Sequence, residues 1–180
     1  MPRARILYLT IMAIFSFCLL AAPSVLSDMN TTNNGDSLFI RAAANNCIWK
    51  FTMGVLAQKQ AASDDVKKYG AMMASDHGKY CSELKRLADT KGIVLTPDPD
   101  RVRQNTAVYL SHEFGAAFDR NYISLMADDN QQDLTLYRTE AQSGKDDQIK
   151  AFASGIVRRF ETYITEAEKI LLNLPKPVLK

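Results

Sequence analysis

Apolar residues recur every three or four positions along most of the chain, with polar residues between them, and this spacing is typical of amphipathic helices. One such pattern spans residues 36–62, and a second spans residues 64–91. Between them, Ser63, Asp64 and Asp65 carry short oxygen-bearing side chains that can accept hydrogen bonds from the free N–H groups of the second helix. The first half of the chain therefore predicts two helices joined by a short turn.

The second half repeats this arrangement after a longer connection. A short helix is expected over residues 101–112, with Asp98 as its cap, because a proline follows Asp98 and suits a first helical position. Gly115 is expected to interrupt the pattern, since glycine weakens a helix. Two longer helices are then predicted over residues 116–142 and 147–173.

The two halves resemble each other when the sequence is aligned with itself so that Val66 falls on Ile149. The other matching positions are Lys67 and Lys150, Tyr69 and Phe152, Tyr80 and Tyr163, Glu83 and Glu166, and Leu87 and Ile170. Short turns make the helices of each half antiparallel, so each half is a helical hairpin. We predict an all-α fold, a four-helix bundle made of two similar hairpins with one long crossover that contains a short helix. We also expect both hairpin turns to lie at the same end.

The N-terminus has the three-part layout of a secretory signal. Arg3 and Arg5 are followed by an uncharged run, residues 6–22, and then by small residues. We expect cleavage before Asp28. An uncleaved membrane anchor is the alternative, because the length of the uncharged run is near the lower limit for a spanning helix.

Removal of this segment changes the charge balance. The whole chain has a net charge of +2, but without Arg3 and Arg5 it carries 20 basic and 20 acidic residues. A neutral chain without a clustered basic face is not expected to bind nucleic acid. In the full chain, 47% of the residues are hydrophobic, which suffices for one folded domain. We divide the chain into a signal peptide (1–27), a flexible lead-in (28–36), a four-helix bundle (37–173) and an extended tail (174–180).

Three polar residues on otherwise apolar stripes are candidates for a buried central layer. Asn46, His77 and Asp129 each lie about 15 residues from a hairpin turn, which places them at one height in the bundle. Burying a carboxylate and an imidazole costs several kcal/mol unless they are bonded. One interpretation is a hydrogen bond between Asp129 and His77, completed by Asp76 or Asn46. The other is a single metal ion held by Asp76, His77 and Asp129.

The di-iron chemistry of helical bundles requires a Glu-x-x-His pair on each of two helices. Ala74 stands three residues before His77, and Tyr109 stands three residues before His112, so neither histidine belongs to such a pair. The chain also lacks a glycine-rich phosphate loop and a nucleophile paired with a base. The sequence therefore favours a protein that is not an enzyme and has no cofactor beyond, at most, one metal ion.

Two cysteines remain after the signal peptide is removed. Cys47 and Cys81 lie at similar distances from the first hairpin turn, so a disulfide between them is geometrically feasible in an oxidising compartment. Two buried free thiols are a second interpretation. A third is a soft metal ion bound by both thiolates and by His77, which lies one helical turn before Cys81.

Several short motifs occur together between residues 37 and 172. They are Gly54-x-Leu56-Ala57, Val66-Lys67-x-Tyr69, Met73-x-x-Asp76-His77, Leu84-x-x-Leu87-Ala88, Phe118-Asp119-x-x-Tyr122 and Ile149-Lys150-x-Phe152-Ala153. As a set they resemble an exported bacterial family of unknown function, whose members are often labelled outer-membrane proteins and are grouped with ferritin-like bundles. The resemblance implies a ferritin-like four-helix bundle and export to the periplasm or cell envelope.

This chain departs from the family at its polar positions. The family typically has a second Asp-His pair in the third long helix and a histidine in the last helix, where this chain has Asn130 and Tyr163. It also has Lys50 and Thr52 where the family commonly has acidic residues. If the family binds metal, the resemblance implies that this member has a depleted site.

We therefore expect an exported, non-catalytic helical-bundle protein of the bacterial cell envelope that acts in binding, assembly or stress protection. An envelope protein or a second copy of the chain would be its partner, and membrane contact would occur only through a retained N-terminal segment. One alternative is a ferritin-like metal-binding or redox protein with a depleted site. The other is an accessory subunit of an envelope complex, which an exposed apolar patch would favour.

Overall fold

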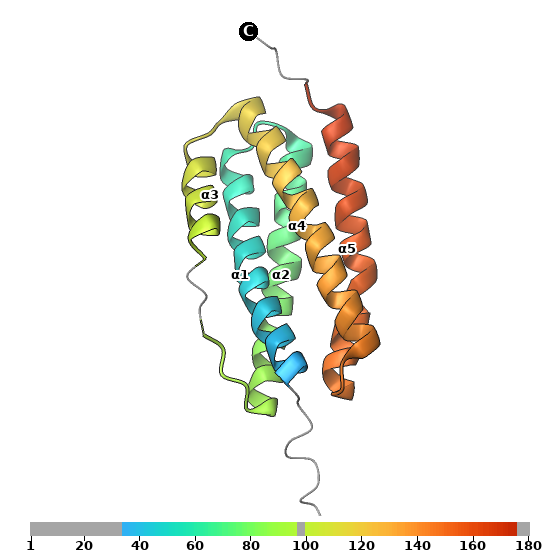
Figure 1. The fold of residues 1–180 in the computed structure, drawn as a ribbon. Helices are drawn as coiled ribbons and strands as arrows, with labels where there is room; N and C mark the ends of the chain where they lie inside the picture. Colours follow the sequence, from blue (N-terminus) through green and yellow to red (C-terminus); the bar gives the residue numbers. More distant parts are fainter. Residues whose placement is uncertain (1–33, 97–99, 176–180) are drawn as a thin grey trace, which may run out of the picture.

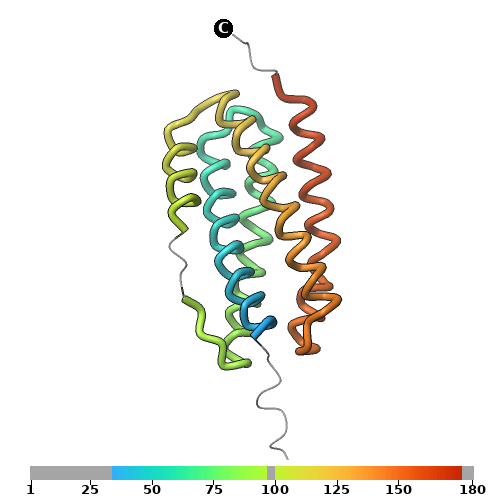
Figure 2. Tube along the Cα trace, viewed as in Figure 1, coloured from blue at the N-terminus to red at the C-terminus, as the bar shows by residue number. Residues whose placement is uncertain are grey.

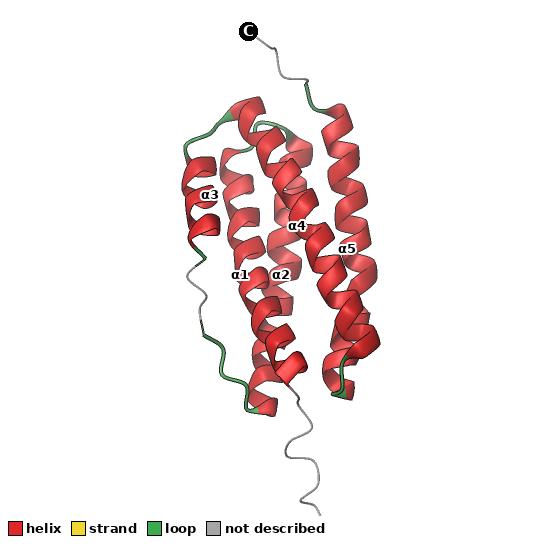
Figure 3. Cartoon of the chain, in the orientation of Figure 1, coloured by secondary structure: helices red, strands yellow, loops and turns green. Residues whose placement is uncertain are grey.

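The computed structural model describes residues 34–96 and 100–175, and these form five α-helices and no strand (Figures 1 and 3). The helices are α1 (Asn34–Gln60), α2 (Asp64–Lys91), α3 (Arg101–Ser111), α4 (Gly115–Ser143) and α5 (Asp147–Asn173). Their bounds lie close to those predicted. The expected signal peptide, part of the lead-in and part of the tail lie outside the described residues. Within the described ranges, no helix is both long and apolar enough to cross a membrane.

The N-terminal lead-in ends earlier than expected, because α1 already begins at Asn34. Asp36, predicted as the end of a flexible segment, is buried. Its carboxylate accepts hydrogen bonds from the backbone N–H groups of Lys145 and Asp146, both at 3.0 Å. These bonds anchor the start of α1 to the turn between α4 and α5.

Two local predictions about helix ends also need correction. Asp100 caps α3, because its side chain accepts hydrogen bonds from the backbone N–H groups of Val102 and Arg103; the expected cap, Asp98, lies outside the described residues. The helical pattern is interrupted between Ser111 and Gly115, as expected, but α4 begins at Gly115 itself rather than at residue 116. The φ of Gly115, 64°, lies in the left-handed region, which glycine adopts without steric cost.

The two hairpin turns lie at opposite ends of the bundle, so the expectation of a shared end is wrong (Figures 1 and 2). The crossover with α3 carries the chain back along the bundle, and α4 therefore begins beside the α1–α2 turn. Asp119, near the start of α4, accepts hydrogen bonds from the backbone N–H groups of Ala62 and Ser63 at 3.0 and 2.8 Å. Asp119 is the counterpart of Asp36 in the internal repeat, so equivalent aspartates bind the two turns.

Positions that match in the internal repeat contact each other halfway along the bundle. The pairs are Lys50 with Asp133, His77 with Phe160, and Asp76 with Arg159. In a symmetric arrangement, a residue can touch its own equivalent only at a two-fold axis. The bundle therefore has a local two-fold axis, which runs from the α1–α4 side through the core to the α2–α5 side.

Helices α1 and α2 lie in close contact where two glycines, Gly54 and Gly70, meet. A Cβ atom added to Gly54 would lie 2.6 Å from the carbonyl oxygen of Gly70 and 2.7 Å from the backbone nitrogen of Ala74. These distances are too short for any side chain, so glycine is required here. A disulfide between Cys47 and Cys81 joins the same two helices.

We expect Gly54→Ala to lower the free energy of unfolding by about 1–3 kcal/mol, because the two helices must move apart to admit the methyl group. Gly155 provides the matched control, since it also lies inside a helix but a Cβ atom added to it would meet nothing within 4 Å. Gly155→Ala should raise stability by about 0.5–1 kcal/mol through helix propensity. Urea denaturation measures both changes, and equal effects of the two substitutions would contradict the close contact.

Candidate functional site

The α1–α4 side of the central layer contains a fully enclosed lysine. Lys50 has no exposed surface, and its Nζ atom lies 2.8 Å from Oδ2 of Asp133 and 3.9 Å from Oδ2 of Asp129. Asn46 donates a hydrogen bond to Asp133 at 2.5 Å, and the indole N–H of Trp49 donates to Asp129 at 2.6 Å. Each charged group in this network thus has a partner on the opposite helix.

A second network joins α2 and α5 on the other side of the layer. Asp76 accepts hydrogen bonds from the guanidinium of Arg159 at 2.8 and 2.5 Å, and from the hydroxyl of Tyr163 at 2.8 Å. Burial raises the pKa of Asp76, but these hydrogen bonds outweigh it, so the pKa lies below its usual value. The carboxylate is therefore ionised at neutral pH and held by its partners.

His77 lies in the core between these two networks. Its side chain is buried, and its ring centroid lies 6.1 Å from that of Phe160 and 5.7 Å from that of Tyr163. Among the described residues, its Nε2 atom has no hydrogen-bond partner. Burial, helped by the positive charge of Lys50 and opposed by Asp76, lowers the pKa of His77 to about 3. The imidazole is therefore neutral at physiological pH and packs as an aromatic ring.

The structure divides the residues expected in one central layer between different environments. Asn46 and Asp129 are half-buried members of the α1–α4 network, whereas His77 is enclosed in the core. Asp129 binds Trp49 in place of the expected His77, and no hydrogen bond joins Asp129 to His77. Asp76 likewise binds Arg159 rather than the imidazole.

The candidate metal ligands do not converge. Among the described residues, no group of three or more His, Cys, Asp or Glu side chains is placed to hold a metal ion. Asp76 and Asp129 have different partners on different helices. Cys47 and Cys81 are joined in a disulfide, so neither thiolate is free for the soft-metal interpretation, and two separate thiols are not present.

Three charged residues of these networks were not among the predicted site residues: Lys50, Asp133 and Arg159. The internal repeat contained a signal that could have found them. It aligns Lys50 with Asp133 and Asp76 with Arg159, so both pairs carry opposite charges at equivalent positions near the middle of long helices. Opposite charges at matching positions indicate contact across a two-fold axis.

A further group of carboxylates lies at the end of the bundle where α4 meets α5. Asp146 caps α5 and forms an ion pair with Lys91 at 2.6 Å. Glu140 is buried nearby. Burial, together with the negative charges of Asp36 and Asp146, raises the pKa of Glu140 to about 7, and Lys150 opposes this shift.

The sequence model of a family described as "Domain of unknown function (DUF4142)" matches residues 21–170, which is most of the chain. The chain belongs to this family. DUF4142 membership agrees with the resemblance of the motifs to a bundle family of unknown function. A search of curated proteins finds no match to this DUF4142 chain.

Two crystal structures of DUF305 proteins have similar folds. The first is a candidate secreted protein from Streptomyces coelicolor, with a TM-score of 0.69, 14% identity, and coverage of 77% of this chain and 91% of that one. The second is a DUF305 fragment from Deinococcus radiodurans, with a TM-score of 0.71, 12% identity, and coverage of 79% and 99%. At these identities, the likeness to the DUF4142 chain concerns the fold alone.

We expect Lys50→Met to destabilise the protein by about 3–5 kcal/mol, because it leaves the buried carboxylate of Asp133 without its cation. The double variant Lys50→Met with Asp133→Leu should recover most of this loss, since neither charge then remains buried. Lys85→Met is the matched control, because Lys85 is exposed and pairs with Asp89 on the surface. Its effect should be below about 1 kcal/mol in urea denaturation. A double variant as unstable as Lys50→Met would contradict the pairing.

We expect His77 and Glu140 to oppose each other in the pH dependence of stability. As pH falls below about 6.5, His77 becomes protonated in the unfolded chain but stays neutral in the folded chain, where its pKa is about 3. His77 therefore lowers stability toward acid pH. As pH rises from 4.5 to about 7, the folded chain keeps a proton on Glu140 that the unfolded chain loses, so Glu140 lowers stability toward neutral pH. The two effects overlap and offset each other between about pH 4.5 and 6.5.

Single substitutions should separate these slopes. His77→Phe, which introduces the residue found at the equivalent Phe160, should give a stability that falls with rising pH across this window. Glu140→Gln should give a stability that rises with pH, by at most about 1.4 kcal/mol per pH unit. Urea denaturation at three pH values measures the slopes. Wild-type slopes in both variants would show that neither group has the stated pKa.

Proposed function

We propose that this protein is an exported, non-catalytic binding protein of the bacterial cell envelope. The observation that supports the proposal best is that the charged groups of the central layer are bound to one another. Lys50 is held by Asp133, and Asp76 is held by Arg159 and Tyr163. A catalytic group has to meet a substrate, whereas these groups fasten one helix to another. Any ligand or partner would therefore be recognised by the outer surface.

Two observations support export. The N-terminal segment, which lies outside the described residues, has the composition of a secretory signal. The disulfide between Cys47 and Cys81 is of the kind that persists in oxidising compartments such as the periplasm.

We further propose that the helices follow the ferritin-like order without a ferritin-like metal centre. Helices α2 and α4 run in the same direction and are joined by the long crossover, while contacting helices from different hairpins run in opposite directions (Figure 2). Two positions at which the motif resemblance implies metal ligands carry side chains that are not suited to bind a metal ion. Lys50 brings a cation to the centre, and Tyr163 stands at the position where the motif resemblance implies a histidine.

Exposed apolar side chains favour a second candidate function, that of an accessory subunit in an envelope complex. Ile48 and Phe51 on α1 are 57% and 43% exposed, and Val102 on α3 is 74% exposed. Helix α3 contacts both α1 and α4, so these side chains occur on neighbouring elements. Exposed apolar groups of this kind are common in surfaces that bind other proteins.

We expect a fusion of the full chain to alkaline phosphatase, an enzyme that is active only after export, to be active in bacterial cells. The same fusion without residues 1–27 should be inactive. An inactive full-length fusion would overturn export.

The purified mature protein should fold with substoichiometric iron, manganese, zinc and copper by elemental analysis. Stoichiometric metal that is lost in His77→Ala would overturn the binding-protein proposal in favour of a metal protein.

A further inference from the structure

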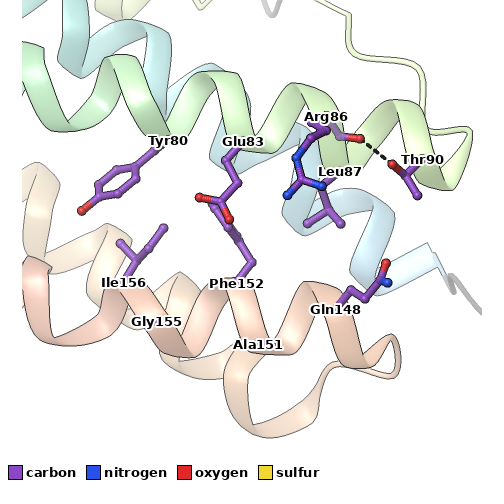
Figure 4. A pocket seen from close by; sticks show the side chains of 10 residues that line it. All are labelled: Tyr80, Glu83, Arg86, Leu87, Thr90, Gln148, Ala151, Phe152, Gly155 and Ile156. Carbon is purple, nitrogen blue, oxygen red and sulfur yellow. Dashed lines mark hydrogen bonds between the residues drawn. The ribbon is translucent and has the colours of Figure 1, made fainter.

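Two solvent-open grooves lie between α2 and α5, one toward each end of the bundle. Groove 1 has a volume of about 600 Å³ and is lined by residues that include Glu83, Arg86 and Phe152 (Figure 4). Groove 2 has a volume of about 390 Å³ and is lined by residues that include Glu166 and Lys169. Both volumes fall in the range of about 300–1,000 Å³ that small-molecule sites occupy.

The two grooves occupy equivalent places in the internal repeat, and five pairs of matching lining positions keep the same kind of side chain. The matching lining residues are Glu83 and Glu166, Arg86 and Lys169, Leu87 and Ile170, Phe152 and Tyr69, and Thr90 and Asn173. At these matching positions, each groove has one carboxylate, one cation, one aliphatic group and one aromatic ring in the same order. The aromatic and aliphatic groups are buried and are needed for packing, but the charged groups face solvent, where packing does not require their repetition.

The charges of groove 1 are not neutralised by each other. Glu83 and Arg86 lie about one helical turn apart on α2, and Figure 4 shows both side chains directed toward α5. No ion pair joins them within the described structure, although Lys85 and Asp89 on the same helix do pair, at 2.7 Å. Glu83 and Arg86 thus present a free carboxylate and a free guanidinium beside the ring of Phe152.

The same holds in groove 2. Glu166 and Lys169 lie about one helical turn apart on α5, and no ion pair joins them among the described residues. The ring of Tyr69 is 2% exposed and lies at the position equivalent to Phe152. Three further charged residues border this groove: Asp65 and Lys68 form an ion pair at 3.7 Å, and the guanidinium of Arg159 is bound to Asp76.

A ligand with a single charge would meet an unfavourable charge about one helical turn away from the favourable one. A ligand that carries both charges would satisfy both, because its ammonium can bind the carboxylate and its carboxylate can bind the cation through charge-assisted hydrogen bonds. The matching aliphatic and aromatic groups are already nearly buried, so an apolar part of the ligand would add only a small contact area. The grooves therefore fit a small zwitterion that is held mainly through its two charges.

We propose that each groove binds an amino acid or short peptide with a free ammonium and a free carboxylate, so that one chain has two equivalent sites. This inference rests on the proposed binding function and names its ligand class. The groove glutamate orients the ammonium, and Arg86 or Lys169 orients the carboxylate. The bridge from Asp76 to Arg159 and Tyr163 separates the two sites and keeps their shapes fixed.

The test is a titration of the isotope-labelled mature protein with the dipeptide leucyl-alanine, followed by amide chemical shifts. We expect saturable shifts in both grooves. The same dipeptide with an acetylated amino end or an amidated carboxyl end should bind about tenfold more weakly or worse, since each block removes one charged hydrogen bond. Equal binding of the blocked dipeptides would overturn the zwitterion assignment and show an apolar groove instead.

Variants assign the sites separately. Glu83→Gln with Arg86→Gln should abolish the shifts in groove 1 and leave those in groove 2, and Glu166→Gln with Lys169→Gln should do the reverse. The matched control is Glu161→Gln with Arg138→Gln, an exposed pair on α5 and α4 that lines neither groove; it should bind like the wild type. If an exported, metal-free protein shows no saturable shift with leucyl-alanine, this ligand class is overturned. The proposed function is tested separately by the reporter fusion.

Discussion

The contact between Lys50 and Asp133 is the interaction on which the arrangement of the two hairpins depends. The two residues occupy equivalent positions in the repeat and meet at the local two-fold axis, where a residue faces its own counterpart. Two identical charges at such a position would repel each other in a low-dielectric interior. The hairpins can bury charged groups at the axis because the facing groups have opposite signs. Asp76 and Arg159 satisfy the same condition on the far side of the core.

This constraint explains why the interior is polar without being reactive. A buried ion pair adds little net stability compared with apolar residues of similar size, but losing one partner is costly, so such pairs fix register. A slip of one helix against another would separate Lys50 from Asp133 and Asp76 from Arg159 together. Between them, His77 and Phe160 contact as rings, and burial lowers the pKa of the imidazole and keeps it uncharged. The same two-fold axis therefore accounts for both the order of the helices and the position of the polar layer.

The helices could be predicted from the sequence because their boundaries depend on local periodicity and on caps such as Asp146. The relative direction of the two hairpins could not be predicted in this way. A residue in the middle of a helix lies equally far from both helix ends, so it occupies the same height whether the two turns lie at one end of the bundle or at opposite ends. Asn46 and Asp129 lie near the middle of helices of similar length, so they meet the same layer in either arrangement. Lys50 was missed because a lone lysine on a helix normally faces solvent, and only its opposite charge to Asp133 in the repeat marks it as buried.

The repeat also shows which differences between the halves follow from packing and which similarities do not. Where the halves face each other, equivalent residues had to differ, as Lys50 and Asp133 do. Where they face solvent, neither half constrains the other, and exposed positions are free to diverge. Glu83 and Glu166 nevertheless remain identical, and Arg86 and Lys169 keep the same charge. Packing explains the first pattern, and the proposed binding of one ligand class in both grooves accounts for the second. A pair of matching charges retained at both ends of one face is the expected result when both ends bind the same kind of ligand.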